Sequence, residues 1–203
     1  TWTKFMKRYG YEPSIYRTES IVDLVKQHKQ GVDIFPENVD VVIGGFPCQD
    51  FSVAGKRKGF NSMRTHDDKV RTESLPTEET RGKLYYWMKE VIDITRPKIF
   101  IAENVKGLVN MGQVKDIIQA DFSHAGGNGY IVLPPQVLHA GNYGVPESRE
   151  RVIFIGIRKN ALKEEILQAL EENNISKDLY PYPEPTHNRT LNNETLAPPV
   201  ILS

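Results

Sequence analysis

The chain has 203 residues, of which 39% are hydrophobic and 26% charged, and its formal net charge at pH 7 is zero. This composition predicts an ordinary soluble protein with one good hydrophobic core, or one domain with an appendage. Because the net charge is zero, any binding of nucleic acid would have to come from a local basic patch. A single cysteine excludes an internal disulfide and a metal site made of cysteine ligands, and it fits a reducing cytoplasm. No apolar run is long enough to span a membrane.

The first elements predicted are two helical segments and a strand. Residues 2–9 form a short amphipathic segment, and residues 20–29 place apolar side chains at helical spacing, with Ser20 as the expected N-cap. Residues 39–43 are mainly apolar and predict a buried strand, which we expect the next two residues, both glycine, to stop.

Cys48 lies in the tight loop that this strand enters. It follows Pro47, whose φ is fixed, and precedes the polar residues Gln49 and Ser52, so the thiol is placed as a nucleophile at the end of a strand. The alternative is a small apolar side chain that closes the core, because most free cysteines are buried and inert. Cys48 alone favours that second interpretation, and the other strand ends decide between the two.

A run of basic residues follows Cys48 in a polar loop that also contains glycine and serine. Flexible basic side chains in such a loop can contact the phosphates of a nucleic acid. The alternative is a solvated surface loop, which is the ordinary state of a charge run. The basic residues are Lys56, Arg57, Lys58, Arg64, Lys69 and Arg71.

Helices and strands alternate in the remaining sequence, which predicts an α/β fold with a parallel or mixed sheet and helices on both faces. Proline follows the first of the remaining helices, a glycine cluster breaks the second, and a Pro-rich extended segment follows the third. The helices are expected at 80–95, 113–124 and 160–173, and the strands at 98–102, 130–139 and 151–158.

Three strand ends carry different chemical groups. Besides Cys48, Glu103 follows the strand 98–102, and Arg149 and Arg151 stand two residues apart where a strand begins, so both can face one pocket. These groups suit the addition of a nucleophile to an electron-poor ring. The thiolate would be the nucleophile, the acid would activate the ring, and an arginine would hold the ring by a carbonyl oxygen.

Simpler interpretations of these charged residues are also open. Glu103 can be a solvated or helix-capping carboxylate. The arginines can form surface ion pairs with Glu147 and Glu150, which is what such a cluster usually does.

Three stretches resemble the fourth, sixth and eighth motifs of the DNA (cytosine-5) methyltransferase family, in that family's order: GGFPCQDFS, ENVKGLV and NYGVPESRERVIFIG. TRGKLYYW is similar to the fifth motif, and PYPEPTH resembles the passage into a target-recognition domain. The resemblance implies a Rossmann-like sheet of S-adenosylmethionine-dependent methyltransferases, incomplete at both ends. Residues 1–160 would then be part of a catalytic domain, and residues 161–203 a helix and Pro-rich connection toward a recognition domain.

The family resemblance also implies a reaction and a set of roles. The methyl group of S-adenosylmethionine goes to C5 of a cytosine flipped out of duplex DNA, most plausibly in a bacterial restriction-modification system. Cys48 would add to C6 of the base, Glu103 would hydrogen-bond N3 and the amine with help from partial burial, Arg151 would hold O2, and Arg149 would order the pocket. The expected cofactor contacts are Trp2, Pro47, Leu84 and Ser20. The expected DNA contacts are Gln49, Ser52 and Arg57.

The sequence departs from the family pattern at several points. Glu147 stands where the eighth motif usually has Gln, and Thr1 stands where an acidic residue usually precedes the stacking tryptophan. The Gly-rich first motif and most of the recognition domain are missing from the sequence. We therefore expect other segments or a second chain to supply them, and we expect the 203-residue chain alone not to methylate DNA.

Two alternatives remain open at this stage. A non-catalytic relative would use the same loops to bind a flipped base, and covalent addition of Cys48 to cytosine would distinguish it from an enzyme. An RNA-directed relative is the other alternative, which a comparison of methyl transfer to duplex DNA and to transfer RNA would test.

Overall fold

The computed structural model describes residues 2–11, 17–46, 85–111, 114–172, 174–176 and 180–201. The strand-end cysteine, the basic loop and several predicted contacts lie outside these residues, namely Pro47, Cys48, Gln49, Ser52, Arg57 and Leu84. The chain divides into two compact units, 1–35 and 36–203, which we describe separately. No helix in the described part of the chain is long and apolar enough to cross a membrane.

The described part of the first unit contains two helices, α1 (Trp2–Lys7) and α2 (Ile21–Lys29). The Ser20 side chain accepts a hydrogen bond from the backbone N–H of Val22 at 3.3 Å, and this caps α2 at its start. The predicted second helix and its N-cap are therefore confirmed.

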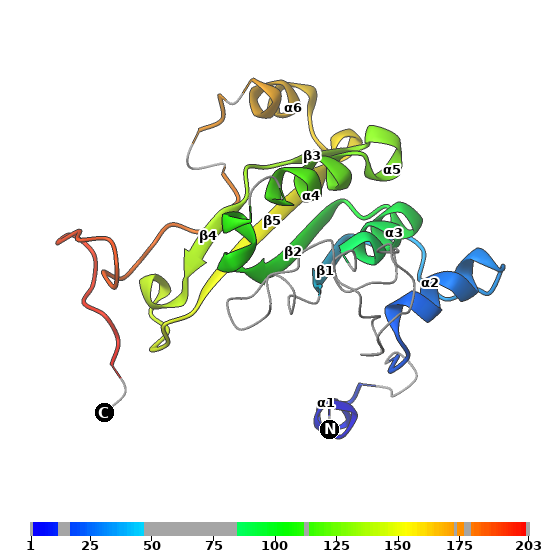
Figure 1. The fold of residues 1–203 in the computed structure, drawn as a ribbon, viewed down its shortest axis with the longest axis horizontal. Coiled ribbons are helices and arrows are strands. Elements are labelled where there is room, and N and C mark those ends of the chain that lie inside the picture. Colours follow the sequence, from blue (N-terminus) through cyan, green and yellow to red (C-terminus); the bar gives the residue numbers. More distant parts are fainter. Residues whose placement is uncertain are drawn as a thin grey trace. The chain divides into compact units, whose positions relative to one another are not determined.

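The second unit is built on a mixed five-stranded sheet (Figure 1). β1 is parallel to its neighbour β2, and β2, β3 and β4 all pair antiparallel with the long strand β5. This arrangement places the first residues of β5 beside the last residues of β2. The strands are β1 (Val41–Gly45), β2 (Ile99–Val105), β3 (Tyr130–Val132), β4 (Gln136–His139) and β5 (Glu150–Arg158).

Helices lie on both faces of the sheet, as predicted. On one face, α3 (Tyr85–Thr95), α4 (Val114–Ser123) and α5 (Ala125–Asn128) close the main core, in which Phe122 contacts the rings of Tyr85, Phe100 and Phe154. On the opposite face, α6 (Glu164–Glu171) contributes Leu170 to a smaller cluster around the buried residues Leu133, Ile155 and Tyr182.

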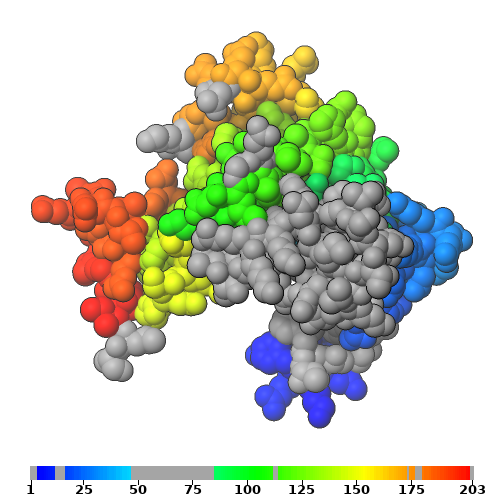
Figure 2. Space-filling view, in the orientation of Figure 1, coloured from blue at the N-terminus to red at the C-terminus, as the bar shows by residue number. Residues whose placement is uncertain are grey.

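The C-terminal segment 180–201 has no helix or strand and consists of irregular chain with bends, a turn and one isolated bridge between His187 and Ala197. It lies against the loop between β4 and β5, where orange and red atoms meet yellow ones in Figure 2. Tyr182 secures its first part, because the phenolic hydroxyl donates to the carbonyl oxygen of Ile153 at 2.9 Å.

Three predicted elements have different boundaries in the structure. The strand expected at 130–139 is two strands, β3 and β4, because Pro134 and Pro135 between them have no backbone N–H for a strand ladder. The helix expected at 160–173 is limited to α6, because a 3₁₀ turn, Lys159–Ala161, precedes it. β2 continues through Glu103 to Val105, so the acid belongs to the strand itself.

β1 differs from its prediction in burial and in length. Within the described part of the chain it pairs only with β2, and the Ile43 side chain is 73% exposed, so the prediction of a buried strand was wrong. The strand continues through both glycines. A Cβ on Gly44 would lie 3.1 Å from the sulfur of Met88, so the missing side chain allows α3 to pack closely on the strand.

The close contact between Gly156 and the ring of Phe100 inside the sheet leads to a prediction about stability. A Cβ built on Gly156 of β5 would overlap the ring of Phe100 on β2. We expect Gly156→Ala to lower the free energy of unfolding, measured by urea denaturation, by about 1–3 kcal/mol through overpacking. Val137→Ala, at a partly exposed position of β4, is the control and should change it by about 0.5 kcal/mol or less. Equal effects of the two substitutions would contradict this packing.

Candidate active site

Glu103 and two arginines meet on one face of the sheet. In the strand register, Glu103 lies between Gly45 of β1 and Ile153 of β5. Side chains two residues apart on a strand share a face, so Arg151 is the diagonal neighbour of Glu103. The Nε of Arg151 lies 2.5 Å from Oε1 of Glu103, and Nη2 of Arg149 lies 4.0 Å from the same oxygen. The structure thus brings both arginines to Glu103, and the assignment of the three residues to an active site stays a prediction.

The two arginines are not equivalent in this arrangement. Arg151 forms the closer ion pair and also donates from Nη1 to the backbone carbonyl of Glu150 at 2.8 Å, so two contacts fix its guanidinium group. The side chains of Arg151, Glu103 and Arg149 are 26%, 38% and 48% exposed. The cluster is thus partly exposed to solvent.

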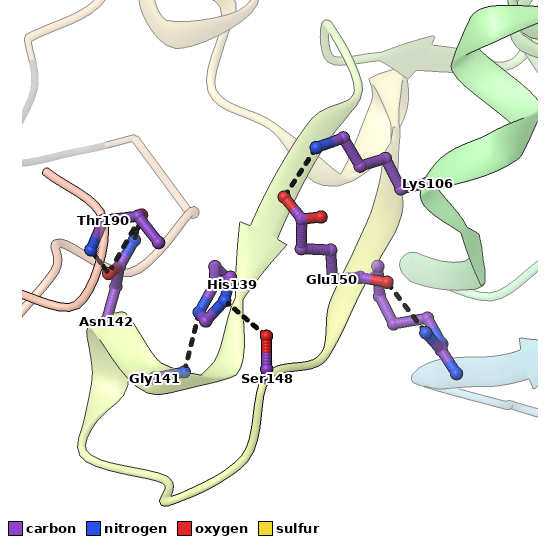
Figure 3. Close-up of polar contacts among 8 residues, drawn as sticks. Lys106, His139, Gly141, Asn142, Ser148, Glu150 and Thr190 are labelled. Atoms are coloured by element: carbon purple, nitrogen blue, oxygen red, sulfur yellow. Dashed lines mark hydrogen bonds and ion pairs between the residues drawn. The ribbon is translucent and has the colours of Figure 1, made fainter. Parts of the chain in front are cut away.

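Glu147 and Glu150, the alternative partners predicted for the arginines, do not form ion pairs with them within the described residues. Glu150 directs its carboxylate to Nζ of Lys106 at 2.8 Å (Figure 3). The arginines are thus paired with Glu103 rather than with either neighbouring glutamate.

Gly45 makes room for the carboxylate of Glu103. A Cβ at this position would lie 3.1 Å from Oε2 of Glu103, which is tighter than nine in ten real Cβ contacts. The glycine at the last position of β1 therefore has a packing function. It leaves one oxygen of Glu103 beside the backbone of β1 while Arg151 contacts the other.

Asn104 is a structural residue that sequence reasoning missed. It is 2% exposed, its Nδ2 donates to the carbonyl oxygen of Phe46 at 3.3 Å, and its Oδ1 accepts from the N–H of Val105 at 2.8 Å. Phe46 immediately precedes Pro47 in the sequence. The signal was available, because the alternation along β2 places Asn104 on the same buried face as Phe100 and Ala102, where a polar side chain needs partners.

The predicted cofactor contacts are only partly covered by the described residues. The backbone of Trp2 is described within α1 but its side chain is not, and Pro47 and Leu84 lie outside the described ranges. Ser20 belongs to the first unit, where its side chain caps α2. The roles of these residues in cofactor binding stay predictions, as do those of Cys48 and the expected DNA contacts.

Comparison with known proteins agrees with the motifs quoted above. The family model described as C-5 cytosine-specific DNA methylase matches residues 8–68 and 70–198, which is nearly the whole chain. The chain belongs to the C-5 cytosine-specific DNA methylase family.

Individual relatives show how much of a family member the chain represents. The type II methyltransferase M.HpaII of Haemophilus parainfluenzae is 37% identical over 131 residues, which cover 62% of this chain and 30% of that protein. M.FnuDI of Fusobacterium nucleatum is 35% identical over 180 residues, which cover 85% of this chain and 42% of that protein. A solved structure of a Spodoptera frugiperda DNMT2 mutant is 18% identical, with a TM-score of 0.40 over 70% of this chain and 41% of that one. The chain thus spans less than half the length of these relatives.

Asn104 generates a prediction for this methylase chain. Asn104→Leu removes the donor to Phe46 and the acceptor for Val105, and we expect it to lower the free energy of unfolding by about 1–3 kcal/mol, the usual cost of buried polar groups left without partners. Asn104→Asp retains the acceptor and should also destabilise, because it buries a carboxyl group next to a carbonyl oxygen. Asn174→Leu, at an exposed position, is the control for urea unfolding. An Asn104→Leu variant as stable as this control would contradict the assigned contacts.

Proposed function

We propose that the complete protein containing this chain methylates C5 of cytosine in duplex DNA, and that Glu103, Arg149 and Arg151 hold the flipped base. The observation that carries the proposal is the convergence of both arginines on one strand carboxylate, with Arg151 2.5 Å and Arg149 4.0 Å from Oε1. An acid and a guanidinium group side by side match the N3 and O2 edge of cytosine, because N3 needs a hydrogen-bond donor and O2 a positive charge.

The chemical step that we propose begins at Cys48. Its thiolate adds to C6 of the base, a C6–S bond forms, and the electron pair of the C5–C6 double bond makes C5 nucleophilic. Negative charge then grows toward N3 and O2, where Glu103 shares a proton and Arg151 donates hydrogen bonds. Bound S-adenosylmethionine would supply the methyl group for C5, with S-adenosylhomocysteine as the leaving group. C5 then loses its proton to a base, and the electrons of that C–H bond restore the double bond as the C6–S bond breaks and releases the Cys48 thiolate.

The ion pair of Glu103 and Arg151 supports this assignment through preorganisation. Both side chains are already oriented toward one point before a base arrives, so little reorganisation is needed when charge develops on the ring. Arg151 would exchange part of its contact with Glu103 for O2 of cytosine. Arg149 is farther from Glu103 and would keep that carboxylate in place during the exchange.

S-adenosylmethionine is the methyl donor that family membership implies. The only predicted contact with a described side chain is Ser20, and its capping bond to Val22 does not by itself make a cofactor site.

We propose duplex DNA as the partner and a bacterial restriction-modification system as the setting. The support is the type II methyltransferases from Haemophilus and Fusobacterium among the relatives. In this proposal, residues 1–160 are catalytic, and residues 161–203 lead toward a target-recognition domain. Further segments, or a second chain, would complete the cofactor and recognition sites.

Cys48→Ala tests the nucleophile. In the complete protein we expect it to abolish methyl transfer, because no other cysteine exists in this chain to form the C6 bond. The assay is transfer of labelled methyl groups to mixed-sequence duplex DNA, with circular dichroism to verify the fold. Methyl transfer at the wild-type rate would exclude Cys48 as the nucleophile.

Glu103→Gln separates chemistry from binding. The amide keeps the size of the side chain but cannot exchange a proton with N3, so we expect the single-turnover rate to fall roughly 10²-fold or more. The affinity for DNA, measured by filter binding, should change far less. A rate within twofold of the wild type would show that Glu103 takes no part in the chemical step.

Replacing each arginine by alanine tests their unequal geometry. Arg151→Ala should reduce the stabilisation of the transition state by about 1.5–3 kcal/mol, the scale of a charged hydrogen bond, as measured by kcat/KM. Arg149→Ala should cost less, since its guanidinium lies 4.0 Å from the carboxylate and is more exposed. Equal and small effects would instead indicate a surface ion-pair cluster.

A further inference from the structure

The loop that precedes Arg149 holds the C-terminal segment by a set of hydrogen bonds around Asn142. This residue is 6% exposed. Its Nδ2 donates to Oγ1 of Thr190 at 3.0 Å, and its Oδ1 accepts from the backbone N of Thr190 at 3.1 Å and from Oγ1 at 3.3 Å (Figure 3). Its backbone carbonyl accepts from the N–H groups of Thr186 and His187, both at 2.9 Å. We call this set of contacts the Asn142 clasp.

Two glycines of the same loop allow this close contact. A Cβ on Gly141 would lie 2.7 Å from Cγ of Arg189, and a Cβ on Gly144 would lie 2.8 Å from the ring of His187. Gly144 also has φ +80°, which favours glycine at this position. The stem of Arg189 therefore packs directly on the loop backbone, although the residue as a whole is exposed.

The clasp is joined to the candidate active site through the backbone. Ala140, next to Gly141, donates its N–H to the carbonyl oxygen of Arg149 at 2.8 Å. The stem of Arg189 is thereby held on the same short loop that ends with Arg149. Arg189 is exposed, and within the described residues it forms no ion pair, although Glu147 lines the same small pocket.

We infer that Arg189 contacts a phosphate of the DNA beside the flipped base, and that Asn142 and Thr190 are positioning residues for this contact. The inference rests on the proposed function and extends it to a residue outside the catalytic cluster. An exposed arginine normally loses side-chain entropy when it binds a phosphate, and a stem already fixed on Gly141 reduces that loss. The positive charge also suits a substrate whose affinity depends on phosphate neutralisation.

The salt dependence of DNA binding by the complete protein tests the phosphate contact. The variants are Arg189→Gln and, as a matched control for loss of charge, Lys163→Gln, an exposed residue that precedes α6. Arg189→Gln should reduce the slope of log Kd against log salt concentration by about 0.9, the value for one phosphate contact with duplex DNA. Lys163→Gln should leave the slope unchanged. An unchanged slope in Arg189→Gln, or an equal change in both variants, would overturn the inference.

The clasp is tested with a pair of substitutions at Thr190. Thr190→Val keeps the shape of the side chain but removes the hydroxyl, and Thr190→Ser keeps the hydroxyl. We expect Thr190→Val to raise the KM for DNA by roughly tenfold, the scale of one or two hydrogen bonds, with kcat changed less than about threefold. Thr190→Ser should restore the wild-type KM. A uniform fall in kcat, or no rescue by serine, would overturn the positioning role.

Two further readouts separate this inference from the proposed function. Amide hydrogen exchange at Thr186, His187 and Thr190 should be faster in Thr190→Val, whatever the activity, and unchanged exchange would refute the clasp. Methyl transfer by the wild-type protein tests the function itself. A protein that methylates DNA but keeps the wild-type salt slope in Arg189→Gln contradicts this inference alone, whereas a wild type that binds no duplex DNA contradicts both.

Discussion

The antiparallel pairing of β5 with β2 is the constraint on which the candidate site depends. It places Arg151 opposite Val105 and Ile153 opposite Glu103, so that one carboxylate and one guanidinium group become diagonal neighbours on a single face. A shift of the register by one residue would turn Arg151 to the other face, toward the buried side of Val152. The aromatic core beneath the strands, with Phe100 against the backbone of Gly156, opposes such a shift.

The same end of the sheet brings together groups that are far apart in the sequence. β1 is parallel to β2, so the carboxyl ends of both strands lie at one edge, and β5 begins there because it runs in the opposite direction. Asn104 ties the carbonyl of Phe46 to β2, and Gly45 leaves space for Glu103. The chain therefore enters the Cys48 stretch from a backbone position that is fixed beside Glu103. This agrees with the general tendency of α/β sheets to bind ligands at such an edge.

Much of this arrangement could be predicted from the sequence, because the elements concerned have strong local signals. Ser20 as a cap, the apolar runs at β2 and β5, and the two-residue spacing of Arg149 and Arg151 depend on local pattern. Most of what was missed depends on long-range contacts, and one strand boundary depends on a local signal that was overlooked. The exposure of Ile43 follows from its place at the edge of the described sheet, and the division of β3 from β4 follows from prolines inside an apolar run. The partners of Asn142 lie more than forty residues along the chain, and no local pattern indicates them.

Covalent trapping would test the central claim most directly. The complete protein would be incubated with S-adenosylmethionine and mixed-sequence duplex DNA that contains 5-fluorocytosine. A fluorine at C5 cannot leave as the proton does, so the C6–S bond persists, and the bound peptide can be identified by mass spectrometry. The account predicts a DNA adduct on the peptide that contains Cys48, formed far more slowly in Glu103→Gln. Methylation of ordinary cytosine without any adduct at Cys48, or an adduct at another residue, would contradict it.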